Sequence, residues 1–322
     1  MLRTVLLLLS LLFGFVASLL LLLLVCVCAC RRRARPSRAY GSETARWLHA
    51  QVPARDAVWF NFGDWSVPLD SFAQQCEAFV DLLLAAPIAD EARVPLRVLD
   101  VGCGASGAQS AYVARRIGAS RLHSMLAIDP ALDAAALTHG GKVQLLPLAF
   151  EQLPVEHCAF NTILAVDSLY HIDLPRADLF AALAARFDAA APRCWLAVTD
   201  LLALPAPRGQ TLWSAAWRRA ARALFARLFR APNLTRELTP AQYAAVLERQ
   251  RFTNVRVAVV TDVVLAPFVT HVDEQLARMD GILAPTTAFK FRVFSALLHF
   301  ALRHSLFEYV RVTAEWRRQR AQ

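Results

Sequence analysis

The sequence has few cysteines and none of the spacings that bind a metal or cross-link a small secreted fold. Its 322 residues include seven cysteines, with no C-x-x-C pair and no histidine-paired zinc spacing. So few cysteines in so long a chain exclude a disulfide framework and indicate a reducing compartment for the folded part. The sequence therefore predicts no metal site.

The chain also lacks the basic and aromatic interleaving that is typical of a nucleic-acid-binding surface, although its net charge is +9. Part of this charge lies in arginines that directly follow an apolar run. An anionic membrane surface accounts for such a cluster better than a nucleic acid does, so we expect no nucleic-acid partner. The arginines concerned are Arg31, Arg32, Arg33, Arg35 and Arg38.

The apolar run extends almost without interruption from Val5 to Cys30. As a helix it would be about 39 Å long at about 1.5 Å per residue, which exceeds a hydrocarbon core of about 30 Å. A cleaved signal peptide has a shorter apolar region of roughly 7–15 residues and a small-residue cleavage site. We therefore expect a single-pass transmembrane anchor over residues 1–30 and a basic juxtamembrane linker over residues 31–45.

The charges that flank the run predict its orientation. Only Arg3 precedes it, whereas five arginines follow it, which places the C-terminal domain in the cytosol by the positive-inside rule. The triplet Asn233–Thr235 is a formal glycosylation sequon and argues for the opposite orientation, but such triplets arise often by chance. Cys26, Cys28 and Cys30 are either palmitoylated or simply small apolar residues of the span.

The most informative stretch is Val98–Gly107, in which an apolar pair leads into Asp100 and then into three glycines spaced as G-x-G-x-x-G. This pattern indicates a buried strand, a tight loop and the start of a helix, because glycine accepts positive φ and allows a ligand close to the backbone. Two ligand classes use such loops. A carboxylate at Asp100 would repel the pyrophosphate of a dinucleotide, but it suits the cationic amino-acid tail of S-adenosylmethionine (SAM), directly or by bracing the loop's amides.

Strands and helices alternate steadily after the linker, which predicts a doubly wound, mostly parallel sheet with helices on both faces. We expect strands at residues 96–101, 122–128, 143–148, 162–166, 194–202, 255–260 and 308–313. We expect helices at residues 46–54, 68–87, 108–117, 131–138, 178–187 and 289–306.

An insertion of about residues 203–253 interrupts this alternation and contains a basic amphipathic helix over residues 213–230. The helix either lies in a membrane interface or forms a lid over the substrate pocket with a solvated basic back. Its apolar face would carry Trp213, Trp217, Ala220, Leu224 and Leu228, and its basic face Arg218, Arg219, Arg222 and Arg230.

Several ordered motifs accompany the glycine loop. They are Asn61–Trp65, Val98–Gly104, Ile128–Pro130, Leu153-Pro154 followed by Phe160–Asp167, and Ser168–His171. With these motifs the sequence resembles the class I, Rossmann-like SAM-dependent methyltransferases, in particular the small-molecule branch called methyltransferase type 11, over roughly residues 56–313. The resemblance implies a seven-stranded sheet with an antiparallel last strand, and a methyltransferase domain over residues 46–322.

The resemblance also implies the site. Asp129 would accept the ribose hydroxyls, Pro130 would pack near the adenine, and Phe150 and Glu151 would surround that base. His171 would be the general base, and Tyr170 would position the acceptor or contact the sulfonium. The remaining cofactor-binding residues would be Asp100, Gly102, Cys103, Gly104, Val166 and, from an N-terminal lid, Trp65. Asp167 would support the loop.

One departure from the family pattern bears on the cofactor. Ala149 stands where relatives commonly carry an aspartate for the adenine amino group, and a lost charged hydrogen bond costs about 1.5–3 kcal/mol. The sequence therefore predicts an enzyme that methylates a small, hydrophobic acceptor, with a catalytically degenerate scaffold at a membrane as the alternative. The literal G-x-G-x-x-G also fits an NAD-dependent oxidoreductase, against which Asp100 argues.

Overall fold

A computed structural model describes residues 59, 61–89, 94–132, 141–154, 156–157, 159–206, 212–283 and 285–317. The expected anchor, the basic linker and the helices at 46–54 and 131–138 fall wholly or mainly outside these residues and stay predictions.

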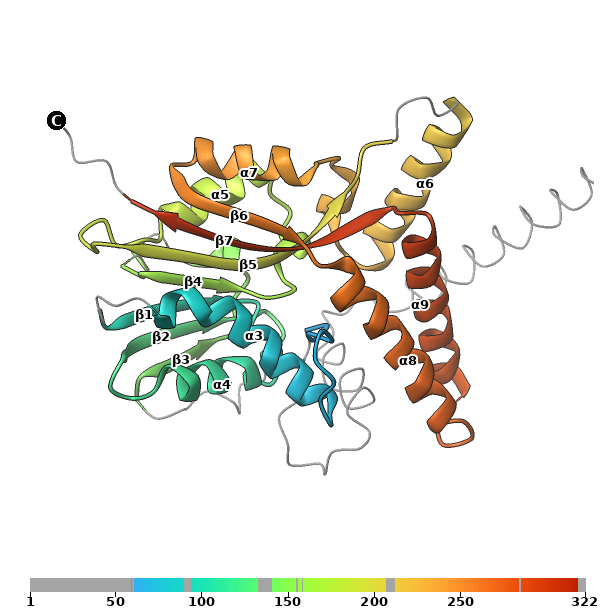
Figure 1. The fold of residues 1–322 in the computed structure, drawn as a ribbon, viewed down its shortest axis with the longest axis horizontal. Coiled ribbons are helices and arrows are strands. Elements are labelled where there is room, and N and C mark those ends of the chain that lie inside the picture. The colour runs from blue at the N-terminus through green and yellow to red at the C-terminus, as the bar shows by residue number, and fades with distance from the viewer. Residues whose placement is uncertain are drawn as a thin grey trace, which may run out of the picture. The chain divides into compact units, whose positions relative to one another are not determined.

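Seven strands form one sheet in the order β3-β2-β1-β4-β5-β7-β6 (Figure 1). Strands β1 to β6 run in the same direction and only β7 is antiparallel, because β7 inserts between β5 and β6 and pairs antiparallel with both, which agrees with the expected topology. The strands are β1 Leu96–Val101, β2 Leu122–Ile128, β3 Val143–Leu146, β4 Thr162–Ala165, β5 Cys194–Ala203, β6 Phe252–Val259 and β7 Phe307–Trp316.

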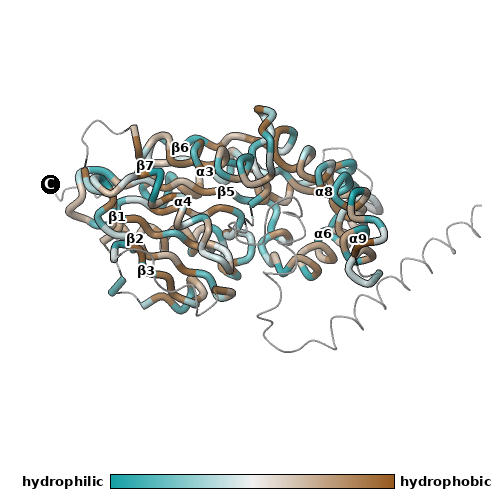
Figure 2. The backbone as a smooth tube through the Cα atoms, turned by 90° about the horizontal axis from the view of Figure 1, so that it is seen from below, coloured by the Kyte–Doolittle hydropathy of each residue, from teal (hydrophilic) through white to brown (hydrophobic). Residues whose placement is uncertain are grey.

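Helices cover both faces of the sheet. One core cluster joins the sheet to α5 (Arg176–Ala184) and α7 (Pro240–Arg249), and a second joins it to α3 (Phe72–Ala89) and α4 (Ala108–Ile117). Figure 2 shows apolar strands between helices of mixed hydropathy, as expected for a parallel sheet buried on both faces.

The α3 helix is long and apolar enough to span a membrane, by length and composition, within the described part of the chain. Its Phe79, Val80, Leu83 and Leu84 are almost wholly buried in the core, and the helix contacts α4 and β5. Packing against the sheet accounts for its apolar composition, so α3 gives only weak evidence for membrane insertion.

Three further helices gather at the end of the sheet where β5 ends (Figure 1): α6 (Leu212–Leu228), α8 (Ala266–Arg278) and α9 (Pro285–Arg303). The sequence pattern predicts helices at the positions of α6 and α9, but it predicts none at the position of α8. A π-helical turn at Thr261–Leu265 joins β6 to α8, and its apolar sequence resembles a continuation of the strand, which hides the start of the helix.

The predicted faces of α6 are wrong at three positions. Arg218 and Arg222, which were assigned to a solvated or membrane-facing basic side, are buried, whereas Ala220 is exposed. Arg218 donates to the carbonyls of His304 and Ser305 at 2.6 and 2.7 Å, at the end of α9. An arginine side chain can be buried when its guanidinium donates to carbonyl groups, because its stem is apolar. The periodicity of a sequence does not show which arginines have such partners. Two of the four arginines of the predicted basic face therefore pack inside the protein, whereas Arg219 and Arg230 stay exposed.

Candidate active site

The loop between β1 and α4 has the backbone that its glycines predict. Gly102, Gly104 and Gly107 all have positive φ, of 78, 80 and 65°. A Cβ on Gly102 would lie 2.2 Å from the Cβ of Ser168, so the loops after β1 and β4 approach each other too closely for any other residue. The Ser168 hydroxyl fixes this approach by donating to the Val101 carbonyl at 2.6 Å.

Asp100 braces the start of α4. Its buried carboxylate accepts from Gln109 Nε2 at 2.8 Å and from Ser110 Oγ at 2.7 Å. Burial raises the pKa of this carboxyl to about 7, and the two hydrogen bonds oppose the shift. Asp100 was expected either to bind the cationic tail of SAM or to brace the amides of the loop. Its hydrogen bonds instead hold two side chains of the following helix, α4. Cys103 likewise turns inward, into a small cluster with Ala127 and Leu145.

Asp129 lies directly after β2 and joins that strand to the glycine loop. Its Oδ2 accepts from the Gly104 amide at 2.9 Å, and its Oδ1 accepts from the Ala131 amide at 2.7 Å. Each carboxylate oxygen has two lone pairs, so both remain able to accept from a ribose hydroxyl. Burial raises the pKa of Asp129. Pro130 beside it is exposed.

The residues expected around the adenine divide between core and surface. Phe150 is buried, with its ring 5.9 Å from the Arg186 guanidinium, and Val166 is also buried, whereas Glu151 is exposed. The amide of Ala149 donates to Gln152 Oε1 at 3.1 Å. Phe150 and Val166 thus form part of the core clusters. Glu151 has an exposed carboxylate.

The N-terminal element Asn61–Trp65 reaches the end of β4 through Phe62, whose amide donates to Asp167 Oδ2 at 2.9 Å. The indole of Trp65 lies 5.0 Å from the His271 ring and 6.1 Å from the Phe72 ring. Trp65 therefore packs between α3 and α8. Phe62 is the residue of this element that contacts the end of β4.

Asp167 is more important than the sequence analysis suggested. It has a positive φ of 53°, and its buried carboxylate accepts from the Phe62 amide and from the Tyr309 hydroxyl of β7. Its own amide donates to Thr199 Oγ1 of β5 at 2.8 Å. Burial raises its pKa to about 7, and the hydrogen bond from Tyr309 opposes that shift most strongly. Asp167 thus joins β4, β5 and β7 to the N-terminal element, which sequence spacing could not reveal.

His171 follows β4 and is oriented by the lid, defined here as residues 203–253. Its Nδ1 lies 3.1 Å from the Arg230 carbonyl, and its ring lies 4.4 Å from that of Tyr170. Burial against neighbouring protein lowers the pKa of His171, while the Arg230 carbonyl and the charge of Asp129 oppose the shift. The charge of Asp129 after β2 therefore acts on His171 after β4.

Tyr170 is buried in an apolar cluster that the lid completes with Phe225 and Leu234. Asn233 holds the lid on the β4 loop by donating to the Ile172 carbonyl. Since Asn233 is 3% exposed, the folded chain does not present this sequon at its surface.

The glycine loop and Asp129 fit SAM. The loop backbone has the positive φ values that allow close approach, and Asp129 keeps acceptor capacity at the end of β2. In the described part of the chain, no group of three histidine, cysteine or acidic side chains is placed to hold a metal ion.

Comparison with known proteins supports this assignment. The family model for a methyltransferase domain matches residues 69–248, more than half of the chain. A tRNA U34 carboxymethyltransferase of Methylococcus capsulatus is 38% identical over 82 residues, which are 23% of this chain and 24% of that protein. The chain thus matches only about a quarter of the length of that curated relative.

Solved structures share the fold. A candidate sarcosine dimethylglycine methyltransferase of Galdieria sulphuraria has a TM-score of 0.62 at 13% identity, over 80% of this chain and 93% of that one. A cyclopropane synthase of Mycobacterium tuberculosis has 0.58 at 14%, over 86% and 99%. A Haemonchus contortus phosphoethanolamine N-methyltransferase solved with SAM has 0.58 at 14%, over 89% and 59%. The chain belongs to the methyltransferase-domain family and is an S-adenosylmethionine-dependent methyltransferase.

Proposed function

We propose that this chain is a membrane-anchored methyltransferase that acts on a small, hydrophobic acceptor with His171 as general base. The observation that carries the assignment of the base is the 3.1 Å contact between His171 Nδ1 and the Arg230 carbonyl. A carbonyl only accepts, so Nδ1 must carry the proton, and Nε2 keeps its lone pair. The lowered pKa of His171 favours this neutral form at physiological pH.

The proposed mechanism assigns a different task to each group. When bound, SAM supplies a methyl group that is already activated by the sulfonium. Asp129 and the glycine loop would hold the ribose and the amino-acid tail. His171 Nε2 would take the proton of the acceptor as its heteroatom bonds to the methyl carbon. Tyr170 and the lid would orient the acceptor and exclude water, which supplies much of the rate enhancement in such a displacement.

The hydrophobic acceptor is supported by the apolar surroundings of the proposed base. Tyr170, which precedes His171, packs in a buried cluster with Phe225, Leu234 and Phe307, so the protein beside His171 is apolar. Structures with the same fold include a mycolic acid cyclopropane synthase, with a TM-score of 0.62 at 12% identity. They also include a geranyl diphosphate methyltransferase, with a TM-score of 0.57 at 14% identity.

Membrane attachment is proposed from the sequence. The apolar run Val5 to Cys30 and the five arginines after it support a single-pass anchor with the catalytic domain in the cytosol. In sealed vesicles of known orientation, external protease should remove the domain from cytosol-side-out vesicles only. Protection of the domain in those vesicles would contradict the orientation.

Equilibrium binding tests the cofactor site itself. Calorimetry on the full chain in detergent should show S-adenosylhomocysteine binding in the micromolar range and no binding of NADH, the control ligand. Binding of neither would favour the scaffold alternative, for which Ala149 is the motivating residue, and Ala149→Asp would then be the rescue variant. Labelled SAM would next be used to screen lipophilic acceptors.

A further inference from the structure

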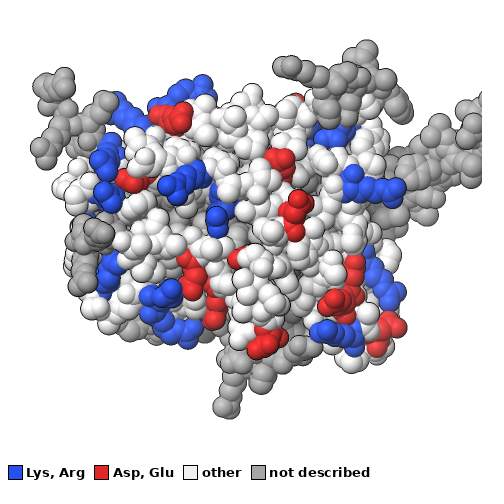
Figure 3. Space-filling view, in the orientation of Figure 1, with Lys and Arg blue, Asp and Glu red and all other residues white. Residues whose placement is uncertain are grey.

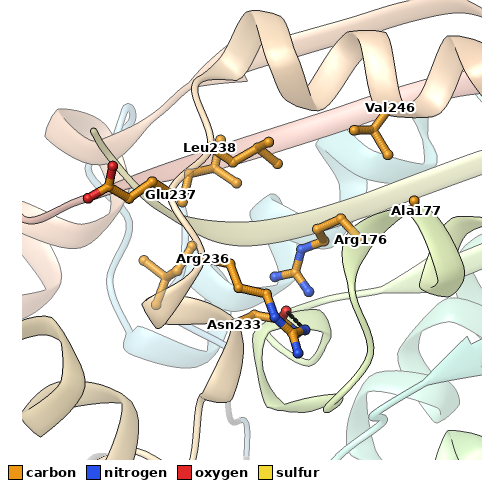
Figure 4. Close-up of a pocket in the computed structure, with 9 residues that line it drawn as sticks. Arg176, Ala177, Asn233, Arg236, Glu237, Leu238 and Val246 are labelled. Atoms are coloured by element: carbon orange, nitrogen blue, oxygen red, sulfur yellow. Dashed lines mark hydrogen bonds between the residues drawn. The ribbon is translucent and has the colours of Figure 1, made fainter. Parts of the chain in front are cut away.

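A cavity of about 170 Å³ lies between the end of β5, the start of α5 and the segment Asn233–Leu238 of the lid. It has room for roughly five water molecules at ~30 Å³ each, and no residue of the glycine loop lines it. Figure 4 shows the guanidinium groups of Arg176 and Arg236 close to each other beside Asn233. Leucine and valine side chains make up much of the remaining wall.

Both arginines keep hydrogen-bonding capacity. Arg176, 8% exposed, donates to Asp200 Oδ1 at 2.5 Å and to the Leu169 carbonyl at 3.1 Å. Arg236 donates to Asn233 Oδ1 at 2.8 Å. A guanidinium has five N–H donors, so these partners leave donors on each arginine for a ligand.

The acidic groups near the cavity do not balance its charge. Asp200 is wholly buried and neutralises Arg176. Asp173 lies 3.6 Å from Arg236 but is 73% exposed, so water screens that pair. Glu237 lines the cavity, yet its carboxylate pairs with Arg222, and Figure 4 shows it turned away from both arginines. Of the two guanidinium groups, only that of Arg176 therefore has a buried carboxylate as its partner.

We propose that this cavity binds a small anionic group, a carboxylate or a phosphate monoester, through Arg236 and Arg176. Planar guanidinium groups match the oxygens of such anions in a bidentate way, and the volume suits a group of this size. The anion is either the head of a larger ligand or a free ion.

Binding of an anion in this cavity would affect residues 168–173, the loop after β4 that carries His171. Arg176 holds the Leu169 carbonyl, Asn233 holds the Ile172 carbonyl and Arg236 pairs with Asp173. These three contacts fix the segment 168–173 on both sides of Tyr170 and His171. An anion that orders the two arginines would therefore stabilise the loop that carries the proposed base, at a site separate from the cofactor.

Inorganic phosphate is the first probe. It would be titrated into the full chain in detergent, at an ionic strength held constant with chloride, with thermal unfolding and calorimetry as readouts. Phosphate should raise the melting temperature of the wild type, because a ligand of the folded state stabilises it, and should slow hydrogen exchange in residues 168–173. None of these three readouts requires methyl transfer, so failure here is distinct from failure of the proposed function.

Variants locate the site. Arg236→Gln, at a half-exposed side chain, should fold normally and weaken phosphate binding about tenfold or more. Arg227→Gln, on the exposed side of α6, is the matched control and should bind as the wild type does. Equal binding by Arg236→Gln, or no stabilisation beyond that of chloride, would overturn the proposal.

Butyl phosphate distinguishes the two sources of the anion. Binding at least tenfold tighter than that of inorganic phosphate, and lost in Arg236→Gln, would show that the anion is the head of a larger ligand whose tail meets the apolar wall. Equal affinity of the two probes, again lost in Arg236→Gln, would identify a free anion.

Discussion

The glycine loop and the lid lie at the same end of the sheet but are held by different forces. The loop depends on backbone geometry, with three positive-φ glycines and two carboxylates bonded to amides or short side chains. The lid depends on long arginines that reach inward to carbonyls and carboxylates, such as Arg222, which donates to the Leu204 carbonyl and to Glu237. A local motif encodes the first arrangement, whereas only the tertiary structure reveals the second.

Figure 3 adds a feature of the surface to this contrast. On the face shown, acidic and basic side chains are interspersed rather than gathered in one patch of a single sign. Several of the lid's arginines are instead internal or paired, so the basic composition of the insertion is partly structural. Counting arginines in this segment therefore overestimates its capacity to bind a membrane.

The strongest test of the loop is Gly102→Ala. The new Cβ would lie 2.2 Å from the Cβ of Ser168 in a residue whose φ is +78°, so one of the two loops must move. We expect loss of measurable S-adenosylhomocysteine binding by calorimetry. The matched control is Gly118→Ala, which has a φ of +80° and no atom within 4 Å of the added Cβ. It should lose about 1–3 kcal/mol of stability through backbone strain and keep its affinity for the ligand. Equal affinities in the two variants would contradict the steric argument.

The next largest effect should come from a substitution in the loop after β4, where His171 contacts the lid. His171→Gln removes the proposed base, and kcat on an identified acceptor should fall by about 10²–10⁴-fold, while the affinity for S-adenosylhomocysteine should change little. His123→Gln, at an exposed strand residue, controls for loss of a histidine. Full turnover by His171→Gln would show that the acceptor needs no base, or that another group supplies it.

The lid itself is tested with Arg222→Met. Arg222 is 2% exposed, and its removal leaves the Leu204 carbonyl and Glu237 without their donor. Because Glu237 is 39% exposed, water compensates in part, and we expect a loss of about 2–3 kcal/mol in urea unfolding. Arg219→Met, at an exposed position of the same helix, should stay within about 0.5 kcal/mol of the wild type. Equal effects of the two substitutions would mean that the buried arginine contributes no more than a surface one.

The same contrast explains what could be predicted from the sequence. Val98–Gly107 predicted strand, loop and helix correctly, because glycine spacing and an apolar run determine that geometry locally. Periodicity placed α6 but assigned Arg218 and Arg222 to the wrong side, since a helical wheel does not show which carbonyls lie opposite. The role of Asp167 required its partners Phe62 and Tyr309, which are 105 and 142 residues distant in the chain.

The last expected effect is a pH dependence that belongs to the strand ends rather than to the lid. Burial raises the pKa of Asp100 and of Asp167 to about 7, above the ordinary value of about 3.9. Between these values the folded state holds protons that the unfolded state has released. The free energy of unfolding should therefore fall as the pH rises from about 4 to 7.

Asp167→Asn isolates one of these two groups. An amide does not titrate, so the decline of stability between pH 4 and 7 should become shallower than in the wild type, as measured by urea unfolding at several pH values. Asp70→Asn, at an exposed residue, should leave the slope as it is. An unchanged slope in Asp167→Asn would mean that the donors of Phe62 and Tyr309 keep this carboxylate ionised despite its burial, and that hydrogen bonding outweighs desolvation where the strands end.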